Sequence, residues 1–183
     1  MSDFRHLDLR AKARPGAFGA AGKTPGVALS VVHPVSLVLV SARKGGAKFV
    51  LEGLATMKAV QVMSAAPGQY YVMAQGKPEG MLAAEIKGKL SGKVSVVDQS
   101  HGRVMIRISG PKARNVLAKG TPVDLHPSVF PVGQSAQTQM AHVGVHLTRT
   151  GEDEFLLSVF RGFSESFWEW LCLSSAEYAY HVV

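Results

Sequence analysis

The distribution of apolar residues predicts two strands and a helix in the first third of the chain. Residues 27–41 are rich in valine and other apolar residues, and β-branched side chains favour extended structure. Pro34 interrupts this run, because proline cannot donate a hydrogen bond to a central strand. Two strands are therefore expected on either side of His33-Pro34. After Gly45-Gly46, apolar residues recur at helical spacing, which predicts a helix over about residues 47–60.

The same criteria predict strands and helices along the rest of the chain. A turn is expected at Pro67-Gly68 and a hairpin turn at residues 150–153, where Thr-Gly-Glu-Asp has turn composition. Further elements are predicted over the following ranges: strands 69–74, 94–98, 104–108, 137–147 and 155–160, and helices 78–88 and 110–119.

A final helix is predicted from Ser164, which is a residue type that caps helices, with Glu165 in its first turn. Its apolar stripe is expected to pack on a sheet and to form core, not a cofactor site. The stripe consists of Phe167, Trp170, Leu171, Ser174 and Tyr178.

Helices that alternate with short strands predict an α+β fold with mixed, mainly antiparallel sheets and helices packed on one face of each sheet. A ferredoxin-like unit, in one or two copies, fits this order of elements. We expect an extended basic arm over residues 1–27 and an α+β domain over residues 28–183. Within that domain two intertwined lobes are expected, over about 28–90 and 91–183.

The net charge of +7 is concentrated in the first half of the chain. Lys and Arg outnumber Asp and Glu by five to two in residues 1–27 and by seven to three in residues 28–90, and the counts are eight and eight in residues 91–183. Aromatic residues do not interleave with the basic ones as nucleic-acid stacking would require. An acidic protein partner is therefore favoured over nucleic acid. The arm is either a disordered tail or a segment ordered along a neighbouring subunit.

The sequence indicates a soluble, cytoplasmic protein without a disulfide. No apolar run approaches the ~18 residues that a membrane-spanning helix needs. Charged residues occupy positions 1–14, where an export signal would carry its apolar segment. Cys172 is the single cysteine, so it can form neither an internal disulfide nor a cysteine-based zinc site.

The residues from Gly19 to Thr24 resemble a phosphate-binding loop only superficially. Such a loop requires a glycine five positions before its second glycine, where this chain has Ala17. Pro25 would also obstruct the helix whose N-terminus faces the phosphate. We expect no nucleotide site here.

Two histidine-containing groups have residue types that occur in metal or catalytic sites. His142 and His146 lie in a segment predicted to be a strand, where residues four apart are separated by about 13 Å, too far to share a metal ion. Asp98, Ser100 and His101 contain the residue types of a catalytic triad. Ser100 and His101 would nevertheless point to opposite faces of an extended chain, so we expect a hydrogen-bonded turn between two strands.

The stretch VVDQSHGRVMIRISGPKARNVLAKGTPVDLHP resembles the signature of the sarcosine oxidase gamma subunit family. The resemblance continues through VFPVGQ and FLLSVFRGFSESFWEWL, covers most of residues 90–180 and is weaker before residue 90. The region from Asp98 to Leu117 is more distantly similar to the glycine-cleavage aminomethyltransferase. These resemblances imply an aminomethyltransferase-like fold.

The aminomethyltransferase resemblance draws attention to Asp124. In that folate enzyme the corresponding helix is followed by Asn-Asp, whose aspartate is important for folate chemistry. Here Val123 replaces the asparagine, and the chain has only about half the length of the enzyme. Asp124 is therefore expected to brace the turn formed by Leu125, His126 and Pro127.

The family resemblance implies a non-catalytic subunit of a four-subunit enzyme. That enzyme oxidatively demethylates sarcosine to glycine and passes the one-carbon unit to tetrahydrofolate. FAD, FMN, NAD, tetrahydrofolate and zinc would lie in other subunits, and this chain would supply no catalytic, cofactor-binding or metal-binding residue. Its partners would be the alpha, beta and delta subunits, beta most directly. Three alternatives stay open: a subunit of a related N-methylglutamate dehydrogenase, a stand-alone folate-binding protein or enzyme, and an RNA-binding module.

Overall fold

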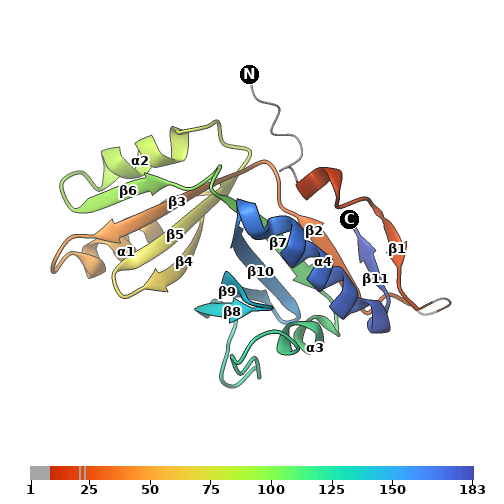
Figure 1. The fold of residues 1–183 in the computed structure, drawn as a ribbon. Coiled ribbons are helices and arrows are strands. Elements are labelled where there is room, and N and C mark those ends of the chain that lie inside the picture. Colours follow the sequence, from red (N-terminus) through yellow and green to blue (C-terminus); the bar gives the residue numbers. More distant parts are fainter. Residues whose placement is uncertain (1–8, 21, 23) are drawn as a thin grey trace. The chain divides into compact units, whose positions relative to one another are not determined.

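The protein consists of two units, each with its own sheet. The first sheet is formed by segments from both ends of the chain, and the second sheet is formed by the segment between them. The computed structural model describes residues 9–20, 22 and 24–183 (Figure 1). Unit 1 comprises the described residues up to Val32 together with residues 104–183, and unit 2 comprises residues 33–103. The boundary between the two lobes was expected near residue 90, whereas unit 2 extends to residue 103. The strand over residues 94–98 belongs to unit 2, because it pairs with the strand over residues 35–42.

Unit 2 is a ferredoxin-like unit, as the order of elements predicted. Its elements along the chain are β3 (Val35–Ala42), α1 (Ala47–Ala55), β4 (Gln61–Ala66), β5 (Gln69–Gln75), α2 (Met81–Lys89) and β6 (Val94–Asp98). The strands lie in the order β4-β5-β3-β6, and every neighbouring pair is antiparallel. The order of strands and helices along the chain is that of the β-α-β-β-α-β motif.

The core of unit 2 lies between its sheet and its two helices. Val38 and Val40 alternate along β3 so that both point to the same face of the sheet. Leu54 of α1 and Ile86 of α2 are fully buried in the same cluster. The apolar residues that recur at helical spacing in the sequence therefore lie on the faces of α1 and α2 that pack against this sheet.

Unit 1 contains a seven-stranded sheet with the order β1-β11-β2-β7-β10-β9-β8. Its strands are β1 (Gly16–Phe18), β2 (Val27–Val31), β7 (Arg103–Ser109), β8 (Ser135–Met140), β9 (Val143–Gly151), β10 (Glu154–Phe160) and β11 (Tyr180–Val182). Its α-helices are α3 (Ala113–Ala118) and α4 (Ser164–Ser175), and single turns of 3-10 helix span Leu9–Ala11, Arg161–Phe163 and Ala176–Tyr178. β11 and β2 run parallel. This sheet does not repeat the strand order of unit 2, so the possible second ferredoxin-like copy is absent from the described residues.

Helix α4 packs on the core of unit 1 through the predicted apolar stripe. Phe167 and Leu171 are fully buried, and Trp170 and Tyr178 are half-buried against the same cluster. Trp168 is buried too, which the predicted stripe missed. The predicted Ser164 cap is wrong: Phe163 occupies the N-cap position, and the Ser164 hydroxyl donates to the Arg161 carbonyl at 2.8 Å.

The strand predicted over residues 137–147 is wrong, because the structure contains a hairpin there. β8 and β9 are antiparallel, and Met140 pairs with Val143 across a two-residue turn. The turn residues Ala141 and His142 have φ values of 51° and 66°. Positive φ at both positions suits a hairpin turn, but these positions usually carry glycine, asparagine or aspartate. The residue types of Ala141 and His142 therefore did not indicate a turn in the sequence.

The described part of the segment expected to be a basic arm packs on this chain's own sheet. Leu9 is only 3% exposed and belongs to the core cluster of unit 1. β1 pairs with β11, and the Gly26 amide donates to the Tyr178 carbonyl at 2.9 Å. Ala21 and Lys23, within the loop compared with a phosphate-binding loop, lie outside the described residues. Among the helices that the structure describes, none is long and apolar enough to cross a membrane.

Candidate functional site

The triad-like group Asp98, Ser100 and His101 forms the predicted turn within unit 2. Asp98 Oδ1 accepts a hydrogen bond from the Ser100 amide at 2.9 Å. The Leu37 amide donates to Ser100 Oγ at 3.0 Å, so the hydroxyl oxygen binds the neighbouring strand. His101 Nε2 lies 3.0 Å from an exposed carboxylate oxygen of Glu79. The carboxylate and the hydroxyl thus bind backbone groups of the turn and of β3.

Asp124 braces the turn that follows α3, as expected. Its Oδ1 accepts a hydrogen bond from the His126 amide at 2.8 Å. His126 Nδ1 lies 2.7 Å from Ser128 Oγ, and the Phe130 amide donates to the His126 carbonyl at 2.8 Å. The Asp124 side chain is exposed, while the neighbouring Leu125 is buried. This arrangement is a local support for the loop.

The histidines do not assemble a metal site in the described part of the chain. His142 lies in the β8–β9 turn, whereas His146 lies in β9 and is only 1% exposed. No group of three or more His, Cys, Asp or Glu side chains among the described residues is arranged to hold a metal ion.

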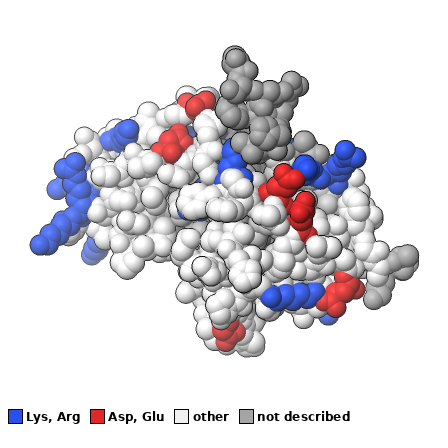
Figure 2. Space-filling view, in the orientation of Figure 1, with Lys and Arg blue, Asp and Glu red and all other residues white. Residues whose placement is uncertain are grey.

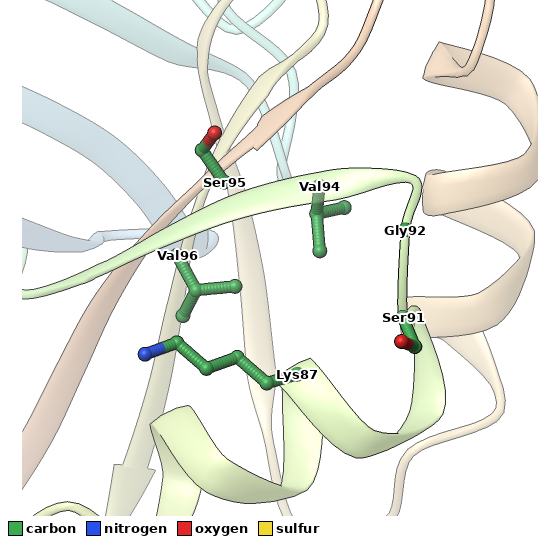
Figure 3. Close-up of a pocket in the computed structure, with 6 residues that line it drawn as sticks. All are labelled: Lys87, Ser91, Gly92, Val94, Ser95 and Val96. Carbon is green, nitrogen blue, oxygen red and sulfur yellow. The ribbon is translucent and has the colours of Figure 1, made fainter.

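A hollow of about 370 Å³ lies in unit 2 between the end of α2 and strand β6 (Figure 3). The Lys87 side chain extends along it beneath Val96. Its lining consists of Lys87, Ser91, Gly92, Val94, Ser95 and Val96. This hollow was not predicted, because the sequence indicates α2 and β6 as separate elements and does not show how they pack together.

Positive side chains surround this end of unit 2, and we call the group the basic end. It is formed by Arg43, Lys44, Lys87, Lys89 and Lys93, all exposed. Figure 2 shows Lys and Arg side chains gathered at the left of the view, where α1 begins and α2 ends. Among the described residues, no carboxylate lies within 4 Å of these five cations. The excess positive charge seen in the sequence is thus partly concentrated on one surface.

A second hollow, of about 470 Å³, lies in unit 1 between α3, α4 and the β8–β9 hairpin. Its lining consists of Lys119, Gly120, Pro122, Gln139, Ala141, His142 and Trp170. Lys119 is already engaged: its ammonium donates to the Ser174 carbonyl at 2.6 Å, pairs with Glu177 and lies 4.8 Å from the centre of the Tyr178 ring. This cation therefore stabilises the end of α4 instead of being presented to a ligand.

Several large apolar side chains of unit 1 are exposed around α4. Leu173 is 77% exposed and Phe163 is 56% exposed, and Phe160 lies just before the helix. Apolar side chains that remain in water lose the stabilisation that burial would give, so groups of them often mark contact surfaces. Leu173 falls outside the predicted core stripe of α4, so no role was predicted for it.

Cys172 and Tyr180 contact each other beside the core of unit 1. Burial raises the pKa of the Cys172 thiol, although its hydrogen bond with Tyr180 acts in the opposite direction. Burial and the hydrogen bond with Cys172 raise the pKa of Tyr180 to about 12. Both groups are therefore protonated at neutral pH, which makes the cysteine a poor nucleophile.

Comparisons with known proteins agree in pointing to one family. The family model described as sarcosine oxidase, gamma subunit family, matches residues 10–177. The sarcosine oxidase subunit gamma of Corynebacterium sp. (strain P-1) is 32% identical over 170 residues, which cover 92% of this chain and 75% of the relative. The subunit gamma of Arthrobacter sp. is 38% identical over 104 residues, covering 56% of this chain and 51% of the relative.

Solved structures show the same fold. A chain of the heterotetrameric sarcosine oxidase from Corynebacterium sp. U-96, in complex with pyrrole 2-carboxylate, matches with a TM-score of 0.75 and 26% identity, covering 87% of this chain and 88% of that chain. The glycine cleavage system aminomethyltransferase T from Bartonella henselae matches with a TM-score of 0.67 and 19% identity, covering 96% of this chain and 57% of that chain.

Proposed function

Because the chain belongs to the sarcosine oxidase gamma subunit family, we propose that it is the gamma subunit of a heterotetrameric sarcosine oxidase. The observation that carries this proposal is the family match, which extends over residues 10–177 and so includes elements of both units. The family expected from the sequence signature is confirmed by this match. The aminomethyltransferase T likeness supports the fold alone.

The proposed role of the chain is structural. Its most suggestive polar side chains act on the backbone: Asp98 and Asp124 each accept an amide hydrogen bond, and Ser100 Oγ accepts one from β3. The exposed apolar residues around α4, with Leu173 foremost, would be buried by a partner subunit. We propose that the beta subunit is the most direct of the three partners, alpha, beta and delta.

The reaction proposed for the assembled enzyme is the oxidative demethylation of sarcosine to glycine, with transfer of the one-carbon unit to tetrahydrofolate. FAD, FMN, NAD, tetrahydrofolate and zinc would be held by the other subunits. A related complex acting on another N-methyl amino acid, such as N-methylglutamate, would use the same kind of subunit. A cytoplasmic location remains a prediction, and cell fractionation tests it.

Co-purification tests the subunit proposal. The tagged chain, expressed in its native host at normal levels, should emerge with three further polypeptides, flavin absorbance and sarcosine-dependent activity. Pairwise co-expression with each partner then tests the preference for beta. A tagged chain that emerges alone and monomeric, or that turns over sarcosine by itself, would contradict the proposal.

Calorimetry with tetrahydrofolate separates the subunit proposal from a stand-alone folate protein. The isolated chain should release no binding heat, because Asp124 already braces its own loop. Micromolar binding that is lost in Asp124→Asn would instead favour a folate-binding protein.

A further inference from the structure

Strand β6 forms an open edge of the sheet in unit 2. Within the described residues the sheet ends at β6, which pairs with β3 on one side only. The Arg43 amide donates to the Lys93 carbonyl at 3.0 Å, and the Gln99 amide donates to the Leu37 carbonyl at 2.8 Å. Backbone groups of an antiparallel strand alternate between its two sides. Odd-numbered residues therefore face β3, and the even-numbered residues direct their N–H and C=O groups to the open side: Val94, Val96 and Asp98.

A hollow lies beside this edge, between β6 and the end of α2. Val94 and Val96 pack their side chains against the core beneath α2, and both also line the hollow of about 370 Å³. Figure 3 shows the Lys87 side chain running along the same edge. A strand placed there would lie about 4.8 Å from β6 and would point alternate side chains toward α2. One of those side chains would meet the Lys87 ammonium.

The charge of the surroundings specifies the chemistry of that strand. The basic end contributes five exposed cations, and no described carboxylate lies within 4 Å of any of them. Open edges usually carry features that discourage pairing, and lysine is the commonest of them. Here Lys87 and Lys93 would repel a basic strand and attract an acidic one.

We propose that β6 accepts an extended, acidic segment of a partner subunit as an additional strand, with its backbone bonded to Val94, Val96 and Asp98 and its acidic side chains beside the basic end. This inference rests on the proposed function, since it assigns one contact within the assembled enzyme. Peptide addition to an open sheet edge derives its affinity from backbone hydrogen bonds and its specificity from alternate side chains.

Two other occupants fit the edge less well. Nucleic acid presents phosphate acceptors but no regular row of donors for the outward carbonyl groups, and the hollow contains no aromatic side chain on which a base could stack. A second copy of the chain paired antiparallel about Val96 would bring one Lys87 toward the other, which like-charge repulsion opposes.

Amide hydrogen exchange in the purified complex and in the free chain tests the proposal directly. In the free chain the Ser95 and Val97 amides, which face β3, should be protected, and the Val94 and Val96 amides should exchange readily. In the complex the Val94 and Val96 amides should slow by about tenfold or more, because they gain partners. Exchange is quenched in acid, the subunits are dissociated, and the remaining amide protons are then detected residue by residue.

Two pairs of variants, measured in the complete four-subunit assembly, add independent evidence. Val96→Pro removes one outward N–H at an edge position where proline is tolerated, and Val96→Thr keeps that N–H. The proline variant should weaken association and the threonine variant should not. Lys87→Glu should weaken association by roughly three- to tenfold at low salt, whereas Lys58→Glu, an exposed charge outside the basic end, should have no effect.

The outcomes separate this inference from the proposed function. A complete complex whose Val94 and Val96 amides exchange as in the free chain would overturn the inference and leave the subunit role intact. A chain that forms no complex would overturn both. Protection that grows with the concentration of the free chain would identify a second copy as the occupant, and protection produced by added RNA would identify a polyanion. Either of these results would also overturn the inference.

Discussion

Arg149 is a cation held in the core region of unit 1 by backbone carbonyl groups. It is 4% exposed, and its guanidinium donates to the Phe130 carbonyl at 2.9 Å and to the Glu152 carbonyl at 2.7 Å. The Gly151 carbonyl accepts a further bond at 3.1 Å. Five fixed donors allow one arginine to satisfy several carbonyl groups at once. The side chain therefore joins the loop before β8 to the β9–β10 turn.

Replacing Arg149 by methionine should lower the free energy of unfolding by about 2–3 kcal/mol, because buried carbonyl groups would lose their donors. Arg149→Lys should fall between methionine and wild type, since one ammonium cannot reach both loops. Urea unfolding of the purified chain measures the difference. Lys58→Met, at an exposed position, is the control. Equal stability of Arg149→Met and the control would show that these bonds contribute nothing.

Asp124 allows a sharper test of its bracing role. Asp124→Ala removes the acceptor of the His126 amide and should cost about 1 kcal/mol of stability. Asp124→Asn keeps a side-chain oxygen at the same position and should cost less. Assembly and sarcosine oxidation by the complex should be unchanged in both variants. Loss of folate-dependent activity in Asp124→Asn, with stability intact, would contradict a purely local role.

The raised pKa of Tyr180 predicts that the folded chain loses stability at high pH. Its pKa is about 12 in the folded chain, against 10.0 for the free side chain. Between these values the unfolded chain loses the phenolic proton while the folded chain keeps it, so the stabilisation is complete below pH 10 and declines as the pH rises toward 12. Absorbance at 295 nm should show a late phenolate step that Tyr180→Phe removes and Tyr70→Phe retains. Disappearance of that step in Tyr70→Phe would refute the assignment.

At the scale of elements, two helix glycines of unit 2 differ in what surrounds them. A methyl group added at Gly53 in α1 would lie 2.4 Å from Leu90 Cδ2, and Leu90 is itself buried. A methyl group added at Gly88 in α2 would meet nothing within 4 Å. The close approach of α1 to the end of α2 therefore depends on Gly53.

Gly53→Ala and Gly88→Ala should thus have opposite effects. Alanine at Gly88 should raise the free energy of unfolding by about 0.5–1 kcal/mol, because alanine favours helix and reduces the freedom of the unfolded chain. Alanine at Gly53 has the same propensity gain but should be destabilising by about 1–2 kcal/mol, because the buried leucine must move. Thermal unfolding of the two variants compares them. A stabilised Gly53→Ala would mean that the helices can separate without cost.

The elements that the sequence predicted correctly are those with a clear local pattern. The strands of residues 94–98 and 155–160 and the final helix show apolar periodicity that survives in the structure. β4 was missed because the predicted helix extends to residue 60 and no element was predicted over the six residues that follow. β1 and β11 were missed because they have three residues each and are defined by pairing with strands that are distant in the sequence: β1 pairs with β11, and β11 pairs with β2 as well as with β1.

The same distinction between local and distant contacts holds for the candidate site. The turns at Asp98 and Asp124 were predicted because their hydrogen bonds span two residues. Arg149 and the hollow beside β6 were not, since they depend on segments brought together by the fold. The open edge of β6 could not be recognised either, because sheet order is a property of the whole unit.

At the scale of the molecule, unit 2 interrupts unit 1 between two adjacent strands. β2 and β7 are antiparallel neighbours: Val31 pairs with Ile106, and the Val32 amide donates to the Met105 carbonyl at 2.8 Å. Unit 2 is continuous along the chain, whereas the sheet of unit 1 needs segments from both ends. Contacts between distant segments form slowly, since their loops must close first. Unit 2 is therefore expected to fold before unit 1 is complete.

The antiparallel pairing of β2 and β7 predicts that unit 1 can fold without unit 2. Replacing residues 33–104 by Asn-Gly would place a two-residue hairpin turn between Val32 and Met105, a pair that already shares a hydrogen bond and is in register with the pairing of Val31 and Ile106. The shortened chain should keep dispersed amide resonances, and cross-strand contacts between β2 and β7 should be visible by NMR. A matched chain with Ala-Ala at the turn should be less stable, because alanine disfavours positive φ. If both chains lack dispersed resonances, the sheet of unit 1 requires unit 2, and the insertion would be part of its folding unit despite the separate cores.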